Sequence, residues 1–225
     1  MYVELSYPIS PDMPVFPGLP KDEFHPHTRM SRGEESNTTM VYLFTHNGTH
    51  VDAPFHFYVK GIPIDKVPLE NFVYFKPLLF EKELGKGELF QPEDLREAGE
   101  ALQEADLLCL SSGYHTVRHN PDIYCDDFPA ISLDTAEMLR TELPNLKAVA
   151  IDTLSIESCV QGPQTDFKVH KALLDGDLFP DRPLLIYEDV NFAPIQNRKV
   201  EQVYAFPLRL AGLDGSPVNI VAKVS

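Results

Sequence analysis

Several features that would place this chain in a specialised class are missing from its sequence. The 225 residues include no tryptophan and only three cysteines, which are widely spaced and form no CxxC pair. A disulfide framework and a cysteine zinc ribbon are therefore excluded, and we expect a reducing, cytoplasmic compartment. No apolar run approaches the ~20 residues of a membrane-spanning helix. The start has no signal-peptide pattern, and no segment repeats.

Positive charge is also scarce. The 19 Lys and Arg residues are outnumbered by 34 Asp and Glu, which gives a formal net charge of -15. An acidic surface is repelled by the phosphates of nucleic acid and by anionic lipid headgroups. We therefore expect no nucleic-acid partner and no membrane partner, and interpret most carboxylates as solvated surface.

Strand-like and helix-like segments alternate along the chain, and strands predominate. The pattern predicts an α/β fold over residues 1–225, a single domain with a mixed sheet or partial barrel and few helices. Runs of β-branched and aromatic residues predict strands at Tyr2–Ser6, Thr39–His46, Phe75–Glu81, Leu107–Leu110, Ala148–Asp152, Leu184–Glu188, Gln202–Leu210 and Asn219–Val224. Apolar periodicity and capping residues predict helices at Pro92–Glu104, at Leu133–Leu143 behind Ser132, and at Phe167–Leu174 behind Asp166.

The segment HNGTHVDAPFH, residues 46–56, holds three of the eight histidines. His46 and His50 have the spacing of the helical HExxH zinc motif. The intervening residues Asn47–Thr49 are poor helix formers, and no glutamate follows His46, so the helical metalloprotease interpretation fails.

Extended geometry explains this spacing better. In an extended chain, even separations place four side chains on one face: His46, His50, Asp52 and His56. Because Gly48 and Pro54 interrupt a ladder, we expect His46 to end the strand from Thr39 and the rest to form an extended loop. Imidazole and carboxylate ligands suit zinc or manganese. The alternative is a set of hydrogen-bonded histidines on a polar sheet face, with the aspartate capping a turn.

This segment resembles the His-x-Gly-Thr-His-x-Asp-x-Pro-x-His signature of the cyclase family. That family includes bacterial kynurenine formamidases, isatin hydrolases and polyketide-cyclase-like proteins. Further similar segments occur in family order: ISPDMPVFPG, SSGY, IDTLS, HKALL and GSPV. The resemblance covers nearly the whole chain and implies a domain of the swivelling β/β/α type.

The resemblance also implies a centre of two divalent ions, zinc or manganese. By similarity, His46, His50 and Asp52 bind the first ion, and Asp52 bridges to a second ion held also by His170 and a downstream glutamate. We choose Glu188 for that glutamate, although in many relatives it follows the helix histidine more closely. Taken alone, the residue at 170 fits an ordinary helix histidine, and the residue at 188 fits a surface glutamate.

Two further residues have roles by similarity. His56 resembles the family's general acid/base, which would take the proton of the attacking water and return it to the leaving amine. Phe16 stands where kynurenine formamidases usually carry a tryptophan that packs against substrate; the alternative is a packing residue in an N-terminal loop. Four other histidines are expected to take no part: His25, His27, His115 and His119.

The activity that the resemblance implies is that of a metal-dependent amidohydrolase, similar to kynurenine formamidase of tryptophan catabolism, on a small aromatic N-formyl amide. Isatin-hydrolase-like opening of a cyclic amide, lactone opening and a polyketide-type cyclase reaction are alternatives within the enzyme class. A non-catalytic, metal-containing binding protein is the alternative of another class. Relatives are commonly homo-oligomers, so a dimer or tetramer is expected.

Overall fold

The computed structural model describes residues 1–180 and 182–225. In these residues, eight strands of the main sheet follow one another in the order β5-β12-β13-β4-β11-β10-β8-β6, and β1 pairs with β13. The strands are β1 (Tyr2–Glu4), β4 (His50–Asp52), β5 (Val73–Tyr74), β6 (Pro77–Glu81), β8 (Leu107–Ser111), β10 (Ala148–Ile151), β11 (Leu185–Glu188), β12 (Val200–Pro207) and β13 (Gly215–Val224).

The sheet is mixed. Strands β6, β8, β10 and β11 run parallel, whereas β4 is antiparallel to both β11 and β13, and β12 pairs antiparallel with β13 and β5. Strand β12 also approaches β6 from the opposite end of the order, so the sheet is nearly closed into a barrel. The predicted α/β fold with a mixed sheet or partial barrel is confirmed.

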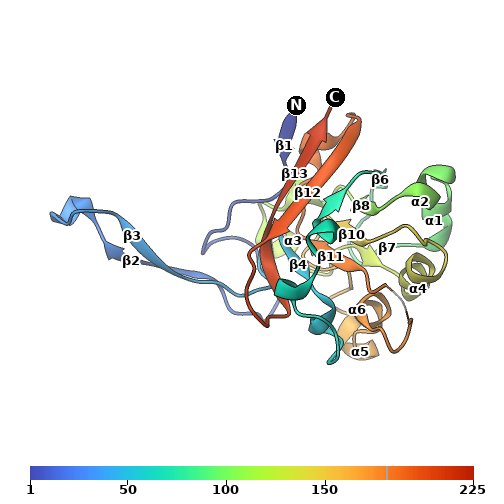
Figure 1. Cartoon of the computed structure of the whole chain (residues 1–225), viewed down its shortest axis with the longest axis horizontal. Coiled ribbons are helices and arrows are strands. Elements are labelled where there is room, and N and C mark those ends of the chain that lie inside the picture. Colours follow the sequence, from blue (N-terminus) through green and yellow to red (C-terminus); the bar gives the residue numbers. More distant parts are fainter. Residues whose placement is uncertain (181) are drawn as a thin grey trace.

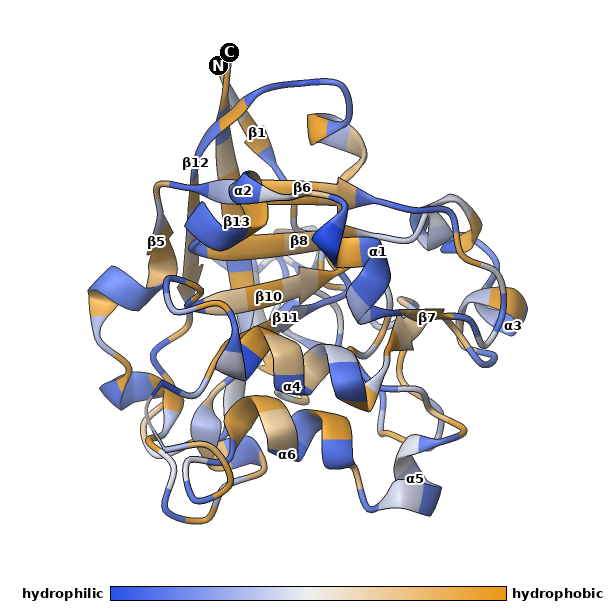
Figure 2. Ribbon diagram, turned by 90° about the vertical axis from the view of Figure 1, so that its right-hand side faces the viewer, coloured by the Kyte–Doolittle hydropathy of each residue, from blue (hydrophilic) through white to orange (hydrophobic). Residues whose placement is uncertain are grey.

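Successive side chains of the parallel strands point to opposite faces of the sheet, and each face has its own hydrophobic core. Leu107 and Cys109 of β8 face the inside of the curled sheet, where they pack with residues of β10, β11, β12 and β13. Leu108 and Leu110 face the opposite side, which helices α4 and α6 cover. Figure 2 shows β8 and β10 as apolar strands with α4 and α6 packed beside them. We call this second side the helix side.

The α-helices are short: α1 (Pro92–Arg96), α2 (Glu100–Glu104), α3 (Pro121–Tyr124), α4 (Leu133–Thr141), α5 (Gly162–Thr165) and α6 (Lys168–Leu174). None of these helices has the length and apolar character needed to cross a membrane. The single helix predicted over residues 92–104 is wrong, because Gly99 takes a φ of 57° and separates α1 from α2.

The two predicted helix caps have different outcomes. Ser132 caps α4 as predicted, its side chain accepting the N–H of Thr135. Asp166 does not cap α6: it ends α5 in the left-handed region, and Phe167 becomes the N-cap without a side-chain hydrogen bond. Two consecutive residues in the left-handed region therefore separate α5 from α6.

In the described part of the chain, two small two-stranded sheets lie outside the main sheet. One pairs β7 (Leu89–Phe90) with β9 (Ala130–Ile131); the other pairs β2 (Glu23–Thr28) with β3 (Thr38–Tyr42) and projects far from the body (Figure 1). The strand predicted over Thr39–His46 is therefore too long, because β3 ends at Tyr42 and a turn follows, closed by the N–H of Asn47 on the carbonyl of Phe44.

The predicted extended loop after His46 is also wrong in part. Residues 50–52 form β4, a strand in the middle of the main sheet. Its ladder partners lie in β11 and β13, more than 130 residues further along the chain, so local sequence signals did not reveal the pairing.

Candidate metal centre and active site

Strand β4 positions the centre of the cluster. In the antiparallel ladder His50 lies directly opposite Glu188, and Asp52 lies opposite Ile186. Directly opposed residues share a face of the sheet, and Ile186 belongs to the core on the helix side. His50, Asp52 and Glu188 therefore point together toward the helices, and all three are buried.

Three other segments complete the cluster. His170 comes from α6, which covers this side of the sheet, and His56 ends the short 3-10 helix Pro54–His56 directly after β4. His46 comes from the turn before β4 and stacks on His56, with ring centroids 3.9 Å apart. The structure thus brings together all six residues predicted for metal binding and acid/base chemistry.

Asp52 is the hub of this cluster. Its Oδ1 lies 2.8 Å from His46 Nδ1 and 3.4 Å from His50 Nε2, and its Oδ2 lies 3.8 Å from His170 Nε2. Glu188 contacts the same imidazoles, with Oε2 3.3 Å from His50 Nε2 and Oε1 3.4 Å from His170 Nε2. Asp52 is therefore placed where one carboxylate could reach two ions.

Two groups have ligand atoms that all lie within 4.8 Å of one another: His46, Asp52 and His56, and His50, Asp52 and Glu188. Both groups contain Asp52, as a bridging role requires. In these groups His46 lies with His56, and His50 lies with Glu188. The family resemblance instead assigns His46 and His50 to the same ion and assigns His56 to proton transfer.

The donor atoms fit divalent cations. His50 Nδ1 donates to the carbonyl of Gly48 at 2.8 Å, which leaves Nε2 with its lone pair facing the cluster. Among the described residues, His50 Nε2 and Asp52 Oδ2 are buried without a hydrogen-bond partner. Unsatisfied buried acceptors are costly, and a cation between these two groups would satisfy both.

Glu157 contacts His170 on the side away from the other cluster residues, and no local sequence pattern indicates this role. The fully buried Glu157 carboxylate accepts His170 Nδ1 at 2.7 Å and the backbone N–H groups of Val169 and His170 at 3.2 and 3.1 Å. Its contact with Nδ1 fixes the tautomer that exposes His170 Nε2 to the cluster, as carboxylates do behind histidine ligands of metals.

Asp214 is a second residue that sequence reasoning missed. It lies in the loop before β13, and its Oδ2 contacts His46 Nε2 at 2.8 Å and His56 Nδ1 at 3.2 Å. These two imidazoles hold the pKa of Asp214 far below its ordinary value. Asp214 therefore remains ionised and orients the His56 ring.

Charges within the cluster offset the effect of burial. Burial lowers the pKa of His170, but the carboxylates of Glu157 and Glu188 outweigh it and raise that pKa to about 10. For Glu188, burial and Asp52 raise the pKa, whereas His170 and His50 outweigh them and lower it to about 2. The buried carboxylates thus stabilise positive charge within the cluster, although burial alone would disfavour it.

A cavity of about 240 Å³ opens onto the cluster. His46, His56, His170 and Glu188 form its polar end. The rest of its lining is mainly apolar and aromatic: Phe16, Leu19, Phe44, Phe57, Leu154 and Phe167. Phe16 therefore lies at the cavity, as its predicted role requires, and also packs edge-to-face against Phe128 with ring centroids 6.0 Å apart.

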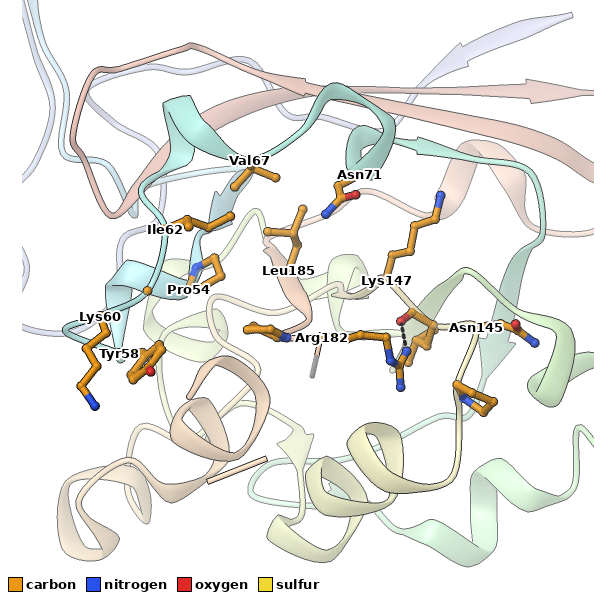
Figure 3. Close-up of a pocket in the computed structure, with 14 residues that line it drawn as sticks. Pro54, Tyr58, Lys60, Ile62, Val67, Asn71, Asn145, Lys147, Arg182 and Leu185 are labelled. Carbon is orange, nitrogen blue, oxygen red and sulfur yellow. Dashed lines mark hydrogen bonds between the residues drawn. The ribbon is translucent and has the colours of Figure 1, made fainter. Parts of the chain in front are cut away.

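A larger cavity of about 560 Å³ lies elsewhere (Figure 3), between Pro54, Lys147 and Arg182. No carboxylate or imidazole is among the described residues that line it. Its cations already have partners: Lys147 donates to the carbonyls of Glu70 and Val73, and Arg182 donates to the carbonyl of Leu146 at 3.0 Å. This cavity lacks the groups that hydrolysis needs.

The four remaining histidines lie apart from the cluster. His25 and His27 belong to the projecting strand β2, where His25 contacts Glu23. His119 is exposed and bonds the carbonyl of Thr116. His115 is half-buried, with Nδ1 3.4 Å from Asp152 Oδ2.

Solved structures share this fold. Isatin hydrolase A from Labrenzia aggregata, bound to benzyl benzoate, aligns with a TM-score of 0.83 over 99% of this chain and 93% of that chain, at 18% identity. A protein from Bacillus stearothermophilus described as a "predicted metal-dependent hydrolase" aligns with a TM-score of 0.73 over 99% of this chain and 97% of that chain, at 22% identity.

The family is also defined by sequence. The Cyclase family model, described as "Putative cyclase", matches residues 3–158, and the chain belongs to this family. A curated relative, the kynurenine formamidase of Bordetella petrii, is 30% identical over 222 residues, which cover 98% of this chain and 96% of the relative. The predicted family resemblance is confirmed.

Proposed function

We propose that this protein hydrolyses a small aromatic N-formyl amide. The protein is a metal-dependent hydrolase of C–N amide bonds, the class to which its kynurenine formamidase relative and its isatin hydrolase neighbours point. The observation that carries the proposal is the buried imidazole and carboxylate cluster at one end of an aromatic-lined cavity.

In this proposal, two divalent ions, zinc or manganese, are held by His46, His50, Asp52, His170 and Glu188. The two buried atoms without partners, on His50 and Asp52, support this ligand set. A bound divalent cation supplies Lewis acidity, which polarises a carbonyl group and lowers the pKa of water to about 7. The chain offers the nitrogen and oxygen donors that both metals accept.

His56 is the proposed general acid/base. Asp214 accepts a hydrogen bond from His56 Nδ1, which leaves Nε2 of the ring as the nitrogen that can accept a proton. That nitrogen takes a proton from the attacking water and then gives it to the nitrogen of the departing amine. Stacking on His46 limits rotation of the ring between these two transfers.

The apolar lining selects the substrate class. Phe16, Phe57 and Phe167 line the cavity, and aromatic rings favour offset-stacked or edge-to-face contacts with another ring. The volume of about 240 Å³ suits a single substituted ring. The same walls keep bulk water from the reacting amide.

The test combines metal content with substrate preference. Purified protein is analysed for zinc and manganese, stripped with a chelator, and assayed before and after each metal is restored. We expect hydrolysis of N-formylkynurenine that depends on metal, is lost in His56→Gln, and is kept in the matched exposed variant His119→Gln. Metal-loaded protein that is inactive on amides, isatin and lactones alike would contradict the proposal in favour of a binding protein.

The proposal also covers the extent of the catalytic domain and the oligomeric state of the enzyme. Residues 1–225 act together as one catalytic domain, since both the first and the last thirds of the chain contribute to the cavity. We propose that the enzyme works as a homo-oligomer, a dimer or tetramer, in the cytoplasm. Cysteines without disulfide partners suit that reducing compartment.

A further inference from the structure

The residue after Glu188 has an unusual backbone conformation. Asp189 has a φ of 51°, in the left-handed region, and its side chain is fully buried. Its backbone N–H donates to the carbonyl of Thr153 at 2.7 Å. Sparsely populated backbone conformations persist only where the surrounding structure holds them, and they concentrate at functional sites. The contacts that hold Asp189 therefore bear on its neighbour Glu188.

An arginine from another segment holds the Asp189 carboxylate. Arg118 follows the 3-10 helix Tyr114–Val117 and donates from Nε to Oδ1 at 2.7 Å and from Nη2 to Oδ2 at 2.6 Å. Tyr124 of α3, which is fully buried, donates its hydroxyl to Oδ1 at 2.7 Å. Only 14% of the Arg118 side chain is exposed, so salt and water screen this pair weakly. The bidentate geometry fixes both the position and the plane of the carboxylate.

Two more residues close a cycle of contacts. The Arg118 guanidinium stacks on the Tyr7 ring, 3.7 Å from its centroid, and the backbone N–H of Tyr7 donates to Thr49 Oγ1 at 2.9 Å. Thr49 Oγ1 in turn donates to the carbonyl of Asp189 at 2.6 Å. The cycle joins four separate segments of the chain. We call its members, Tyr7, Thr49, Arg118 and Asp189, the Asp189 clamp.

The clamp continues the connection between the two strands that carry the cluster. Glu188 and His50 are the last pair of the β4–β11 ladder, so sheet pairing supports them from one side only. Thr49 directly precedes His50, and Asp189 directly follows Glu188. The hydrogen bond between Thr49 and Asp189 therefore ties the two strands one residue beyond the last ladder pair.

We propose that the Asp189 clamp positions Glu188 opposite His50 for metal binding, with Arg118 and Asp189 as positioning residues. Neither belongs to the two candidate ligand groups. A buried ion pair is weak evidence for stability, because apolar side chains of similar volume often stabilise a fold as well. What the pair supplies is a fixed geometry, and metal ligands need support that holds them within a fraction of an ångström.

Metal affinity tests this role without any assay of activity. Arg118→Lys keeps the positive charge, but an ammonium group cannot form the bidentate contact. Competition between Zn²⁺ chelators and the protein should show that one metal equivalent binds at least ~10-fold more weakly, as for other groups that hold metal ligands in place. Wild-type affinity for both equivalents in Arg118→Lys would overturn the proposal.

Two tyrosine variants separate positioning from stability. Tyr124→Phe removes a buried hydroxyl that bonds Asp189, whereas Tyr74→Phe removes a buried hydroxyl that bonds Tyr187 at 2.8 Å. Both should lower the urea midpoint of the metal-free protein to a similar extent, because each loses one buried hydrogen bond. Only Tyr124→Phe should also weaken Zn²⁺ binding. Equal weakening in the two variants would overturn the proposal, since the effect would then follow stability alone.

A double-mutant cycle shows whether the clamp acts through Glu188. In a Glu188→Gln background, adding Arg118→Lys should change the Zn²⁺ affinity by no more than the ~2-fold error of additivity. Far-ultraviolet circular dichroism checks that each variant is folded. The same loss of affinity with and without Glu188 would overturn the proposed route.

Cobalt gives a spectroscopic readout that a change in stability does not move. The visible absorption of bound Co²⁺ reports the geometry of its nitrogen and oxygen ligands. At saturating Co²⁺ the spectrum of Arg118→Lys should differ from that of the wild type, and the spectrum of Tyr74→Phe should match it. Identical spectra for all three proteins would overturn the positioning role.

The inference rests on the proposed metal centre, and the two can fail separately. A wild type that binds no divalent ion would refute the centre and the clamp's role in it. Wild-type binding that Arg118→Lys leaves unchanged would refute the clamp's role alone. Metal binding that depends on the clamp, in a protein that hydrolyses no amide, would support the clamp and refute the proposed function.

Discussion

The carboxylate of Glu157 permits a sharp test of how the proposed second metal position is built. Glu157→Gln preserves the shape of the side chain but removes its charge and turns one oxygen into an N–H₂ donor. The native carboxylate receives three N–H groups, two from the backbone and one from His170 Nδ1. A glutamine can accept these bonds only through its remaining oxygen.

Glu157→Gln should affect metal binding by changing the tautomer of His170. If the new amide donates to Nδ1, the ring proton moves to Nε2, which is the nitrogen that faces Asp52 and Glu188. Replacing a carboxylate behind a histidine ligand typically costs 10–100-fold in metal affinity, or about 1.4–2.8 kcal/mol. Metal-free stability should also fall, by about 1–3 kcal/mol for an unsatisfied buried N–H.

Chelator competition measures the metal affinity, and urea denaturation of the metal-free protein measures the stability. Glu137→Gln, an exposed glutamate of α4, is the control and should change neither quantity. If Glu157→Gln lowers stability but binds both metal equivalents as tightly as the wild type, the argument from the His170 tautomer is refuted.

Three further predictions follow from the cluster and its surroundings. His56→Gln should lower kcat by about 10²–10⁴-fold with little loss of metal, as measured by turnover and elemental analysis; an unchanged kcat would exclude His56 as acid/base. Asp52→Asn should lose both metals, because both candidate groups contain Asp52, and retention of two equivalents would exclude a bridging role. The hydrogen bond to Asp152 raises the pKa of His115, so its stabilising effect is complete below about pH 6.5 and is lost as the pH rises through the raised value. Denaturation at pH 6 and pH 8 should show a smaller pH dependence for His115→Gln than for wild type or His119→Gln, and equal slopes would refute this account.

The sequence could assign His46, His50, Asp52 and His56 to one candidate site because they are close in sequence and regularly spaced. The even separation of His50 and Asp52 does place both side chains on one face, and they lie in a strand rather than the expected loop. His170 and Glu188 required the family resemblance, since nothing local distinguishes them from ordinary residues of a helix and a strand. The structure brings them together through the pairing of β4 with β11 and the packing of α6 on the helix side.

Other features were missed because only tertiary contacts define them. Asp214 lies 158 residues from His56, and no local pattern connects them. Glu157 follows the recognised IDTLS run but acts on a histidine 13 residues later. The break at Gly99 had a visible signal, since glycine within a helical pattern weakens it. The wrong cap at Asp166 arose because Asp166 and Phe167 both take left-handed backbone conformations there, which propensity alone did not predict.

Strand β4 has a consequence for how the protein reaches its native state. It is three residues long, and its partners in β11 and β13 follow it by more than 130 residues, so loop-closure entropy opposes early formation of this part of the sheet. The cluster assembles only when that pairing is complete, and an unfolded chain can offer a cation little more than residues 46–56. A cation that binds only the native state stabilises that state. At a free concentration 100 times its dissociation constant, it adds about 2.7 kcal/mol to the free energy of unfolding. The melting temperature should therefore report the concentration of free metal.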